Sequence, residues 1–333
     1  MADLRLNRRR ALQGLGGLGL SAAMPLSRAW ADAGGASLNF LAVGDWGREG
    51  NFRQRDVAIR MGESAHELGV PFVISVGDNF YDDGVTSIDD PAWKNSFEAV
   101  YDAPSLQVPW YVALGNHDYH GNSQAQLDYS AKSSRWRLPA RWYSYKEQAP
   151  DNSRIEFFIT DTSPMMSEYY EDGAVKVKVG DQKQNVNVQL RWLDSALAAS
   201  RADWKIVIGH HPIYSGRLPT GVTDNSDDKV ERMTGGSPDL IARLDPILHR
   251  HGVRLYLNGH DHDLRHVLHG ATHYVCTGAG SKMADHCDTG GSDFCSLQSG
   301  FVACAVNRDR LRVAYRDYTG AELYIVDIPR MAS

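Results

Sequence analysis

Five short blocks of this sequence share one pattern: an apolar run, then glycine, then a residue that can bind a metal ion. The apolar runs are typical of strands buried on both faces, so each potential ligand would follow the carboxyl end of a strand. Aspartate, asparagine and histidine suit hard or borderline cations, and no cysteine takes part. One block would mean little, but five predict a site with enough ligands for two ions. The blocks are residues 40–45, 73–79, 111–117, 206–211 and 255–262.

The number of ligands suggests how two ions would share them. A pair of cations about 3.5–4 Å apart needs a bridging carboxylate and separate ligands for each ion. Asp78 is the expected bridge because its strand should lie centrally. A tight Gly-His-Asp-His turn would send His260 and His262 to different metals, and Tyr81 could add a phenolate, which ferric iron favours. The expected sets are Asp45, Asp78, Tyr81 and His262 for one metal, and Asp78, Asn116, His210 and His260 for the other.

The elements that must position these blocks alternate between strand and helix in the first half of the chain. Such alternation predicts a parallel sheet with crossover helices and a site at the carboxyl ends of its strands. After residue 253, short strands with turn-length gaps predict a largely antiparallel sheet. We therefore expect one domain, residues 37–330, with two packed sheets. The expected helices are residues 52–68, 91–100, 188–199 and 239–251. One expected strand ends at residue 45. The other expected strands are residues 71–77, 110–114, 155–160, 205–208, 254–257, 266–268, 273–276, 301–306, 311–315 and 323–327.

Residues 1–33 are predicted to be an export signal peptide of the twin-arginine type. Arg8-Arg9-Arg10 precedes a modestly apolar, glycine-rich stretch and then Ala-x-Ala motifs that suit cleavage. The apolar stretch is too short to span a bilayer comfortably, so no stable membrane anchor is expected after the signal is removed. The expected location is the bacterial periplasm or the medium. The alternatives are a disordered basic tail and a membrane anchor.

The charge of the chain limits its expected partners. The 333 residues carry a formal net charge of −6, and removing a signal with five arginines and two aspartates would make the rest more acidic. A mildly acidic surface argues against nucleic-acid or membrane binding as the main task. Bound cations would still allow an anionic substrate, because they would dominate the field inside the site. We expect a monomer.

All four cysteines fall late in the chain, and their spacing contains no Cys-x-x-Cys, which argues against a zinc ribbon. In an oxidising compartment they are expected to form structural disulfides. Of the three possible pairings, we favour Cys287 with Cys295 in a short loop and Cys276 with Cys304 between neighbouring strands.

The ligand blocks resemble those of the calcineurin-type metallophosphoesterases, and within them the small, tartrate-resistant type of purple acid phosphatase. Residues 108–112, 191–193 and 274–280 fit as well, so the resemblance covers roughly residues 39–328. With the element pattern, it predicts a mixed α/β (α+β) fold, a four-layer α/β/β/α sandwich of two mixed β-sheets flanked by helices. The matching motifs are Asp45-Trp46-Gly47, Gly77-Asp78-Asn79-Phe80-Tyr81, Gly115-Asn116-His117-Asp118, Gly209-His210 and Gly259-His260-Asp261-His262.

The resemblance implies an acid phosphatase that hydrolyses phosphate monoesters. It assigns Asp45, Asp78, Tyr81 and His262 to Fe(III). It assigns Asp78, Asn116, His210 and His260 to a divalent Fe, Zn or Mn ion. Metal-activated hydroxide would attack the phosphorus of a small phosphate ester. His117 would lie beside the substrate, where its imidazolium could protonate the leaving alkoxide and favour acidic pH.

The chain departs from animal relatives in one respect. Those relatives carry a second histidine in the loop after the Gly-His block, whereas residues 212–248 here contain none. His211, directly after a ligand, is expected to have an outer or packing role. The possible substitutes for the missing histidine are Arg217, Lys229 and Arg232. Surface or packing roles are expected for His249, His251, His266, His269 and His286; the alternative for His286 is a place in the lining of the site.

Two other functions remain open. One keeps the metals but changes the ester, giving a phosphodiesterase or nucleotide pyrophosphatase of the same superfamily; Tyr81 argues against it, since diesterase relatives usually lack that phenolate. The other is a di-iron redox or phosphate-binding protein, which the full ligand set with His117 disfavours. Residues 163–187 and 215–237 are expected to be surface loops, which either shape substrate access or are inert insertions.

Overall fold

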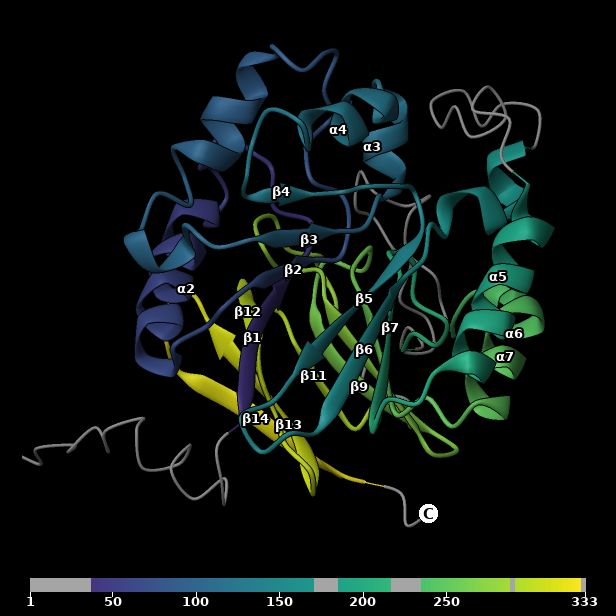
Figure 1. Cartoon of the computed structure of the whole chain (residues 1–333). Helices are drawn as coiled ribbons and strands as arrows, with labels where there is room; N and C mark the ends of the chain where they lie inside the picture. Colours follow the sequence, from purple (N-terminus) through teal and green to yellow (C-terminus); the bar gives the residue numbers. More distant parts are fainter. Residues whose placement is uncertain (1–36, 171–184, 217–234, 288–290, 331–333) are drawn as a thin grey trace, which may run out of the picture. The chain divides into compact units, whose positions relative to one another are not determined.

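The computed structural model describes residues 37–170, 185–216, 235–287 and 291–330. Two seven-stranded sheets dominate this part of the chain (Figure 1). The first sheet has the order β14-β13-β12-β1-β2-β3-β4, and the second has the order β11-β9-β10-β8-β7-β6-β5. Both sheets are mixed, because each contains parallel pairs, such as β1–β2 and β8–β10, and antiparallel pairs, such as β1–β12 and β9–β10.

In the first sheet, β1 to β4 run parallel, and β12 to β14 extend the other side antiparallel. β2 lies between β1 and β3, as expected for the strand that leads to Asp78. The strands are β1 (Leu38–Val43), β2 (Val73–Ser75), β3 (Trp110–Val112), β4 (Trp136–Arg137), β12 (Gly300–Val306), β13 (Arg310–Asp317) and β14 (Glu322–Pro329).

In the second sheet, β6, β7, β8 and β10 run parallel, and β5, β9 and β11 are antiparallel to their neighbours. The strands are β5 (Tyr143–Gln148), β6 (Arg154–Ile159), β7 (Trp204–Ile208), β8 (Leu255–Asn258), β9 (Leu264–His269), β10 (Thr272–Thr277) and β11 (Phe294–Ser296).

The helices lie on the outer faces of the two sheets or beside the ligand loops (Figure 1). The α-helices are α2 (Gln54–Leu68), α3 (Asn116–His120), α4 (Ser123–Tyr129), α5 (Val186–Ala199), α6 (Pro238–Arg243) and α7 (Asp245–Arg250). The shorter turns are the π-helical η1 (Trp93–Glu98) and the 3₁₀ segments η2 (Pro104–Leu106), η3 (Ser163–Met165) and η4 (Ser167–Tyr170).

Aromatic side chains join the inner faces of the two sheets. Phe40 of β1 packs edge-on against Phe157 of β6, with ring centroids 5.3 Å apart, and both side chains are fully buried. On the outer face of the second sheet, Val207 of β7 shares a buried cluster with Leu193 of α5 and Leu248 of α7. Helix α2 packs on the other side of the first sheet, against β1 and β12. This arrangement confirms the predicted sandwich of two mixed sheets flanked by helices.

The prediction for the C-terminal third was wrong in part. The late strands do not form one antiparallel sheet, because β8 and β10 pair in parallel in the second sheet while β12 to β14 complete the first. The helix expected over 239–251 is two helices, since Pro246 lies in the first turn of α7 and cannot continue α6. Several short elements of the described residues were not expected, namely α3, α4, β4, β5, β11 and the 3₁₀ segments η2, η3 and η4.

The loop expected at 163–187 does not begin on the surface. Ser163, Pro164, Met165 and Met166 are buried, and both methionines join the cluster under α5 to α7. The hairpin considered within this loop, most of the loop expected at 215–237, and the predicted signal peptide lie outside the described residues. None of the helices in the described ranges is both long and apolar enough to cross a membrane.

One of the two expected disulfides is present. Cys287 and Cys295 are bonded, which confirms the short-loop pairing. The Cys276–Cys304 pairing was wrong: both residues are buried free thiols, and they belong to strands of different sheets, β10 and β12.

Candidate dinuclear metal centre

The predicted ligands converge where the carboxyl ends of both sheets meet. Asp45, Asp78 and Asn116 follow the neighbouring parallel strands β1, β2 and β3, whereas His210 and His260 follow the neighbouring strands β7 and β8. Backbone hydrogen bonds join the sheets there: the Gly44 amide donates to the Thr277 carbonyl at 2.9 Å, and the Gly280 amide donates to the Gly44 carbonyl at 3.0 Å. The topology thus places five loops from two sheets around one point.

One group of ligand atoms surrounds the hydroxyl of Tyr81. This oxygen lies 3.1 Å from Asp45 Oδ1 and 2.9 Å from Asp78 Oδ2. It also lies 3.0 Å from His262 Nε2. Four donor atoms at these separations match the first predicted set.

A second group surrounds the side-chain oxygen of Asn116. Asn116 Oδ1 lies 3.0 Å from His210 Nε2 and 3.1 Å from His260 Nδ1. His210 Nε2 is also 3.3 Å from Asp78 Oδ1. Asp78 therefore points one carboxylate oxygen to each group, which is the geometry of a bridging ligand.

The residues fit a dinuclear metal centre. Tyr81 is partly exposed, and each of the other predicted ligands is at most 5% exposed. Burial would raise the pKa of Asp78, but His210 and His117 outweigh it and hold that pKa well below its ordinary value, so this carboxylate stays ionised. Two buried carboxylates facing three imidazoles supply the oxygen and nitrogen donors of hard and borderline cations.

Three of the ligands have strained backbone conformations. Asp45, Asp78 and His260 have left-handed φ values of 59°, 50° and 70°, which cost roughly 1–3 kcal/mol each for residues other than glycine. The preceding glycines permit close approach: a Cβ on Gly115 would overlap Asp78 Oδ1, and one on Gly259 would overlap Asp45 Oδ2. The glycine in these two blocks is therefore required by the crowding of the ligands themselves.

An outer layer of hydrogen bonds holds the ligands in place. His210 Nδ1 lies 3.0 Å from the Val76 carbonyl, which orients Nε2 toward Asp78 and Asn116. Asp118 accepts hydrogen bonds from the amides of Gly115 at 2.8 Å and Asn79 at 3.0 Å. Asp118 is a positioning residue that the sequence analysis quoted in a motif but gave no role.

His117 lies beside the first group without joining it. Its ring centroid is 4.3 Å from that of Tyr81, and its amide donates to Asp78 Oδ1 at 2.9 Å. Its Nδ1 is 2.5 Å from the Asp82 carbonyl, so Nδ1 carries a proton and Nε2 is the nitrogen that can exchange one. His120, whose ring centroid is 4.6 Å from that of His117, is a neighbour that the sequence analysis did not single out.

His211 is part of the packing behind the ligands. It is fully buried, with Nδ1 2.8 Å from Thr162 Oγ1 and Nε2 2.7 Å from the Tyr169 hydroxyl. Both ring nitrogens are engaged, in agreement with the outer role expected for it. The substitutes considered for the missing histidine, Arg217, Lys229 and Arg232, lie outside the described residues.

A buried ion cluster begins within the last ligand block and extends just beyond it, and the sequence analysis missed it. The Arg265 guanidinium is 2% exposed and contacts Asp261 Oδ2 at 3.1 Å and the carboxylate of Asp263. The Ser215 hydroxyl donates to Asp261 as well. The cluster fixes the turn that carries His260 and His262.

Replacing Arg265 with methionine is expected to destabilise the protein by about 3–5 kcal/mol, because it leaves two buried carboxylates without their cation. Chemical denaturation of the metal-loaded protein measures this change. Arg60→Met is the matched control, since Arg60 pairs with Glu63 on the exposed face of α2 and should change stability by less than about 1 kcal/mol. Equal effects of the two substitutions would contradict the role given to the cluster.

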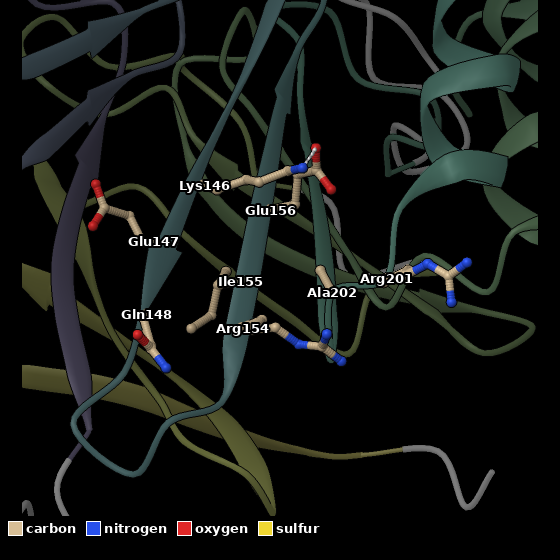
Figure 2. A pocket seen from close by; sticks show the side chains of 8 residues that line it. All are labelled: Lys146, Glu147, Gln148, Arg154, Ile155, Glu156, Arg201 and Ala202. Carbon is tan, nitrogen blue, oxygen red and sulfur yellow. Dashed lines mark ion pairs between the residues drawn. The ribbon is translucent and has the colours of Figure 1, made fainter.

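The depression lined by β5 and β6 lies away from the metal ligands. Its lining includes Lys146 of β5 and Arg154 and Glu156 at the start of β6, whereas the ligand loops follow the carboxyl ends of the strands. A dashed line in Figure 2 marks the ion pair of Lys146 with Glu156 on the neighbouring strand. Lys146 Nζ and Glu156 Oε1 are 3.8 Å apart. No predicted ligand lines this depression, so it takes no part in the proposed chemistry.

Comparisons with known proteins agree with this geometry. The family model described as calcineurin-like phosphoesterase matches residues 38–264. Purple acid phosphatase 7 of Arabidopsis thaliana is 37% identical over 297 residues, covering 86% of this chain and 85% of the relative. Human tartrate-resistant acid phosphatase type 5 is 31% identical over 325 residues, covering 91% and 94%.

Solved structures share the fold. The Plasmodium protein GAP50, described as the anchor in the inner membrane complex, superposes with a TM-score of 0.71 at 25% identity, covering 90% of each chain. The purple acid phosphatase PPD1 of yellow lupin superposes with a TM-score of 0.63 at 17% identity, covering 89% of this chain and 54% of that one. The family match and the relatives above 30% identity show that this chain belongs to the calcineurin-like phosphoesterase family.

Proposed function

We propose that this protein is an acid phosphatase that hydrolyses small phosphate monoesters at a dinuclear Fe(III)–M(II) centre, where M is Fe, Zn or Mn. The observation that carries the proposal is the pair of ligand groups sharing Asp78, with Tyr81 in one group and His117 beside it. The purple acid phosphatase relatives support the same reaction. In this proposal the protein acts as a monomer.

The residues divide the work as follows. Bound cations would polarise the phosphoryl oxygens and lower the pKa of water so that hydroxide is available to attack phosphorus. Asp78 would hold the two cations at a fixed separation, and the outer hydrogen bonds of His210 would keep its imidazole aligned. His117 would bind the phosphoryl group and pass a proton from Nε2 to the leaving alkoxide, with Nδ1 anchored to the Asp82 carbonyl.

Paired substrates test the reaction class. The purified, metal-loaded protein is assayed with an aryl phosphate monoester and the matching bis(aryl) diester. We expect the monoester to have the higher kcat/KM at acidic pH. A higher kcat/KM for the diester would instead support the phosphodiesterase alternative.

Tyr81→Phe tests the ferric assignment. A phenolate bound to Fe(III) absorbs visible light, so the wild type is expected to be violet and the variant to lose that band while still binding metal. An absorption spectrum with metal analysis on both proteins measures this. Colourless, zinc-only wild-type protein with full activity would overturn the Fe(III) assignment but not the dinuclear centre.

We also propose that the protein is exported by the twin-arginine route to the bacterial periplasm or beyond. The motif Arg8-Arg9-Arg10 and the Cys287–Cys295 disulfide, which suits an oxidising compartment, support the proposal. Replacing Arg8 and Arg9 with lysine should leave the full-length precursor in the cytoplasm, as seen by fractionation of a bacterial host. Unchanged export of the variant would contradict the route.

A further inference from the structure

A second cluster of metal-binding side chains lies outside the candidate dinuclear centre. Asp245 and His249 are one turn apart on α7, and His269 ends β9. One potential ligand atom from each lies within 4.8 Å of the other two. Strand β9 starts two residues after the ligand His262 and ends at His269. The length of the strand therefore separates the cluster from the dinuclear centre by about 17 Å, and the cluster lies at the opposite end of the strands of the second sheet.

We propose that Asp245, His249 and His269 form a third metal site that binds zinc or a similar borderline divalent cation. Two imidazoles and one carboxylate are the protein ligands of zinc sites that keep a fourth position open. The separation between His249 Nε2 and Asp245 Oδ1 is 3.5 Å. Ligands 2.0–2.1 Å from a tetrahedral zinc ion are about 3.3 Å apart, so this pair already has the required spacing.

The carboxylate is held as a metal ligand would be. Asp245 is 5% exposed; the Tyr214 hydroxyl donates to its Oδ2 at 2.9 Å, and the Tyr274 hydroxyl donates to its Oδ1. A carboxylate oxygen has two lone pairs, so Oδ1 can accept this bond and still bind a cation. Burial and the nearby carboxylate raise the pKa of both tyrosines, which keeps them protonated as donors. Outer hydrogen bonds of this kind orient ligating carboxylates.

The two histidines make the site accessible to cations from solvent. Both are exposed, and their rings stack with centroids 5.6 Å apart and an angle of 16° between planes. The Tyr214 ring lies 4.2 Å from that of His269 and limits its movement. A cation bound here would tie α7 to the turn between β9 and β10, and it would stabilise the folded protein because the unfolded chain lacks the assembled site. This inference does not depend on the phosphatase proposal.

Zinc uptake by the metal-loaded protein tests the third site. The wild type, the double variant His249→Asn/His269→Asn and the control His66→Asn are incubated with Zn(II), desalted and analysed for metal. His66 is an exposed histidine on α2 and has no part in the cluster. We expect the wild type and the control to retain one more zinc per chain than the double variant, and zinc to raise the Tm of those two proteins only.

Circular dichroism and the phosphatase rate should be unchanged in the double variant, since its two histidines are exposed and remote from the dinuclear centre. Equal zinc retention by the wild type and the double variant would overturn the inference. Loss of the same zinc in His66→Asn would overturn it as well, by showing that surface histidines bind zinc without a built site.

Discussion

Asp78→Asn is expected to lower kcat/KM for a phosphate monoester by about a thousandfold or more. Its two carboxylate oxygens face different ligand groups, 2.9 Å from the Tyr81 hydroxyl and 3.3 Å from His210 Nε2. An amide offers one oxygen and no charge, so the variant would lose charge compensation for both cations at once. Losing a single preorganised electrostatic contact in an active site already costs 100- to 1,000-fold.

Metal analysis separates loss of the bridge from misfolding. The variant should contain fewer than two metals per chain while keeping the circular dichroism of the wild type, because asparagine has nearly the same shape. Asp56→Asn, at an exposed position on α2, is the control and should retain both metals and full activity. An Asp78→Asn protein with two metals and near-normal kcat/KM would contradict the bridging role.

His117→Ala is expected to lower kcat for an alkyl phosphate by 100- to 10,000-fold, the usual contribution of a general acid. The loss should be smaller for an aryl phosphate, whose leaving group needs less protonation. Metal content and the visible spectrum should be unchanged, because His117 lies beside Tyr81 and is outside both ligand groups. Kinetics with the two substrates, together with metal analysis, measures these effects.

His120→Ala is the matched control for His117→Ala. His120 packs on the His117 ring, and its Nδ1 lies 3.1 Å from the Asp82 carbonyl. We assign it no part in proton transfer, so its loss should change kcat by less than about tenfold. Equal losses of kcat for alkyl and aryl phosphates in His117→Ala would contradict proton donation to the leaving group.

The ligand blocks could be predicted because their physical requirements are local. A strand buried on both faces needs a continuous apolar run, and crowding at its end requires glycine next to the ligand, as at Gly115 and Gly259. The expectation that Asp78 bridges two metals followed from the central position of its strand, and its carboxylate does face both ligand groups. Such features leave a pattern in a few consecutive residues.

Features that depend on distant parts of the chain could not be predicted. Whether a late strand joins the first or the second sheet depends on which neighbouring strand it pairs with in the folded protein. Strands β8 and β10 pair in parallel, but their apolar residues would suit an antiparallel pair equally well, so the sequence does not reveal the direction. Strand β5 alternates buried or half-buried with exposed residues over a largely polar segment, and β4 has two residues. The free thiols Cys276 and Cys304 show the same limit, because their sequence spacing does not indicate which sheet each joins.

Within the site, the missed residues are those that act through others. Asp118 in α3 and Arg265 near the start of β9 are charged residues, for which a solvent-exposed position is the usual expectation. Only the assembled fold shows that both are buried and hydrogen-bonded beneath the ligand loops. The available indication was an acidic residue directly after His117, His260 and His262, namely Asp118, Asp261 and Asp263.

Reconstitution of metal-free protein is the most direct test of a dinuclear phosphomonoesterase. The protein is stripped with a chelator, shown to remain folded, and titrated with Fe and then with Zn or Mn while hydrolysis of an aryl phosphate monoester is followed at acidic pH. We predict no activity without metal, and full activity once each chain carries both an iron and a second cation in the dinuclear centre. Full activity in the metal-free protein, or none at any metal loading, would contradict the account.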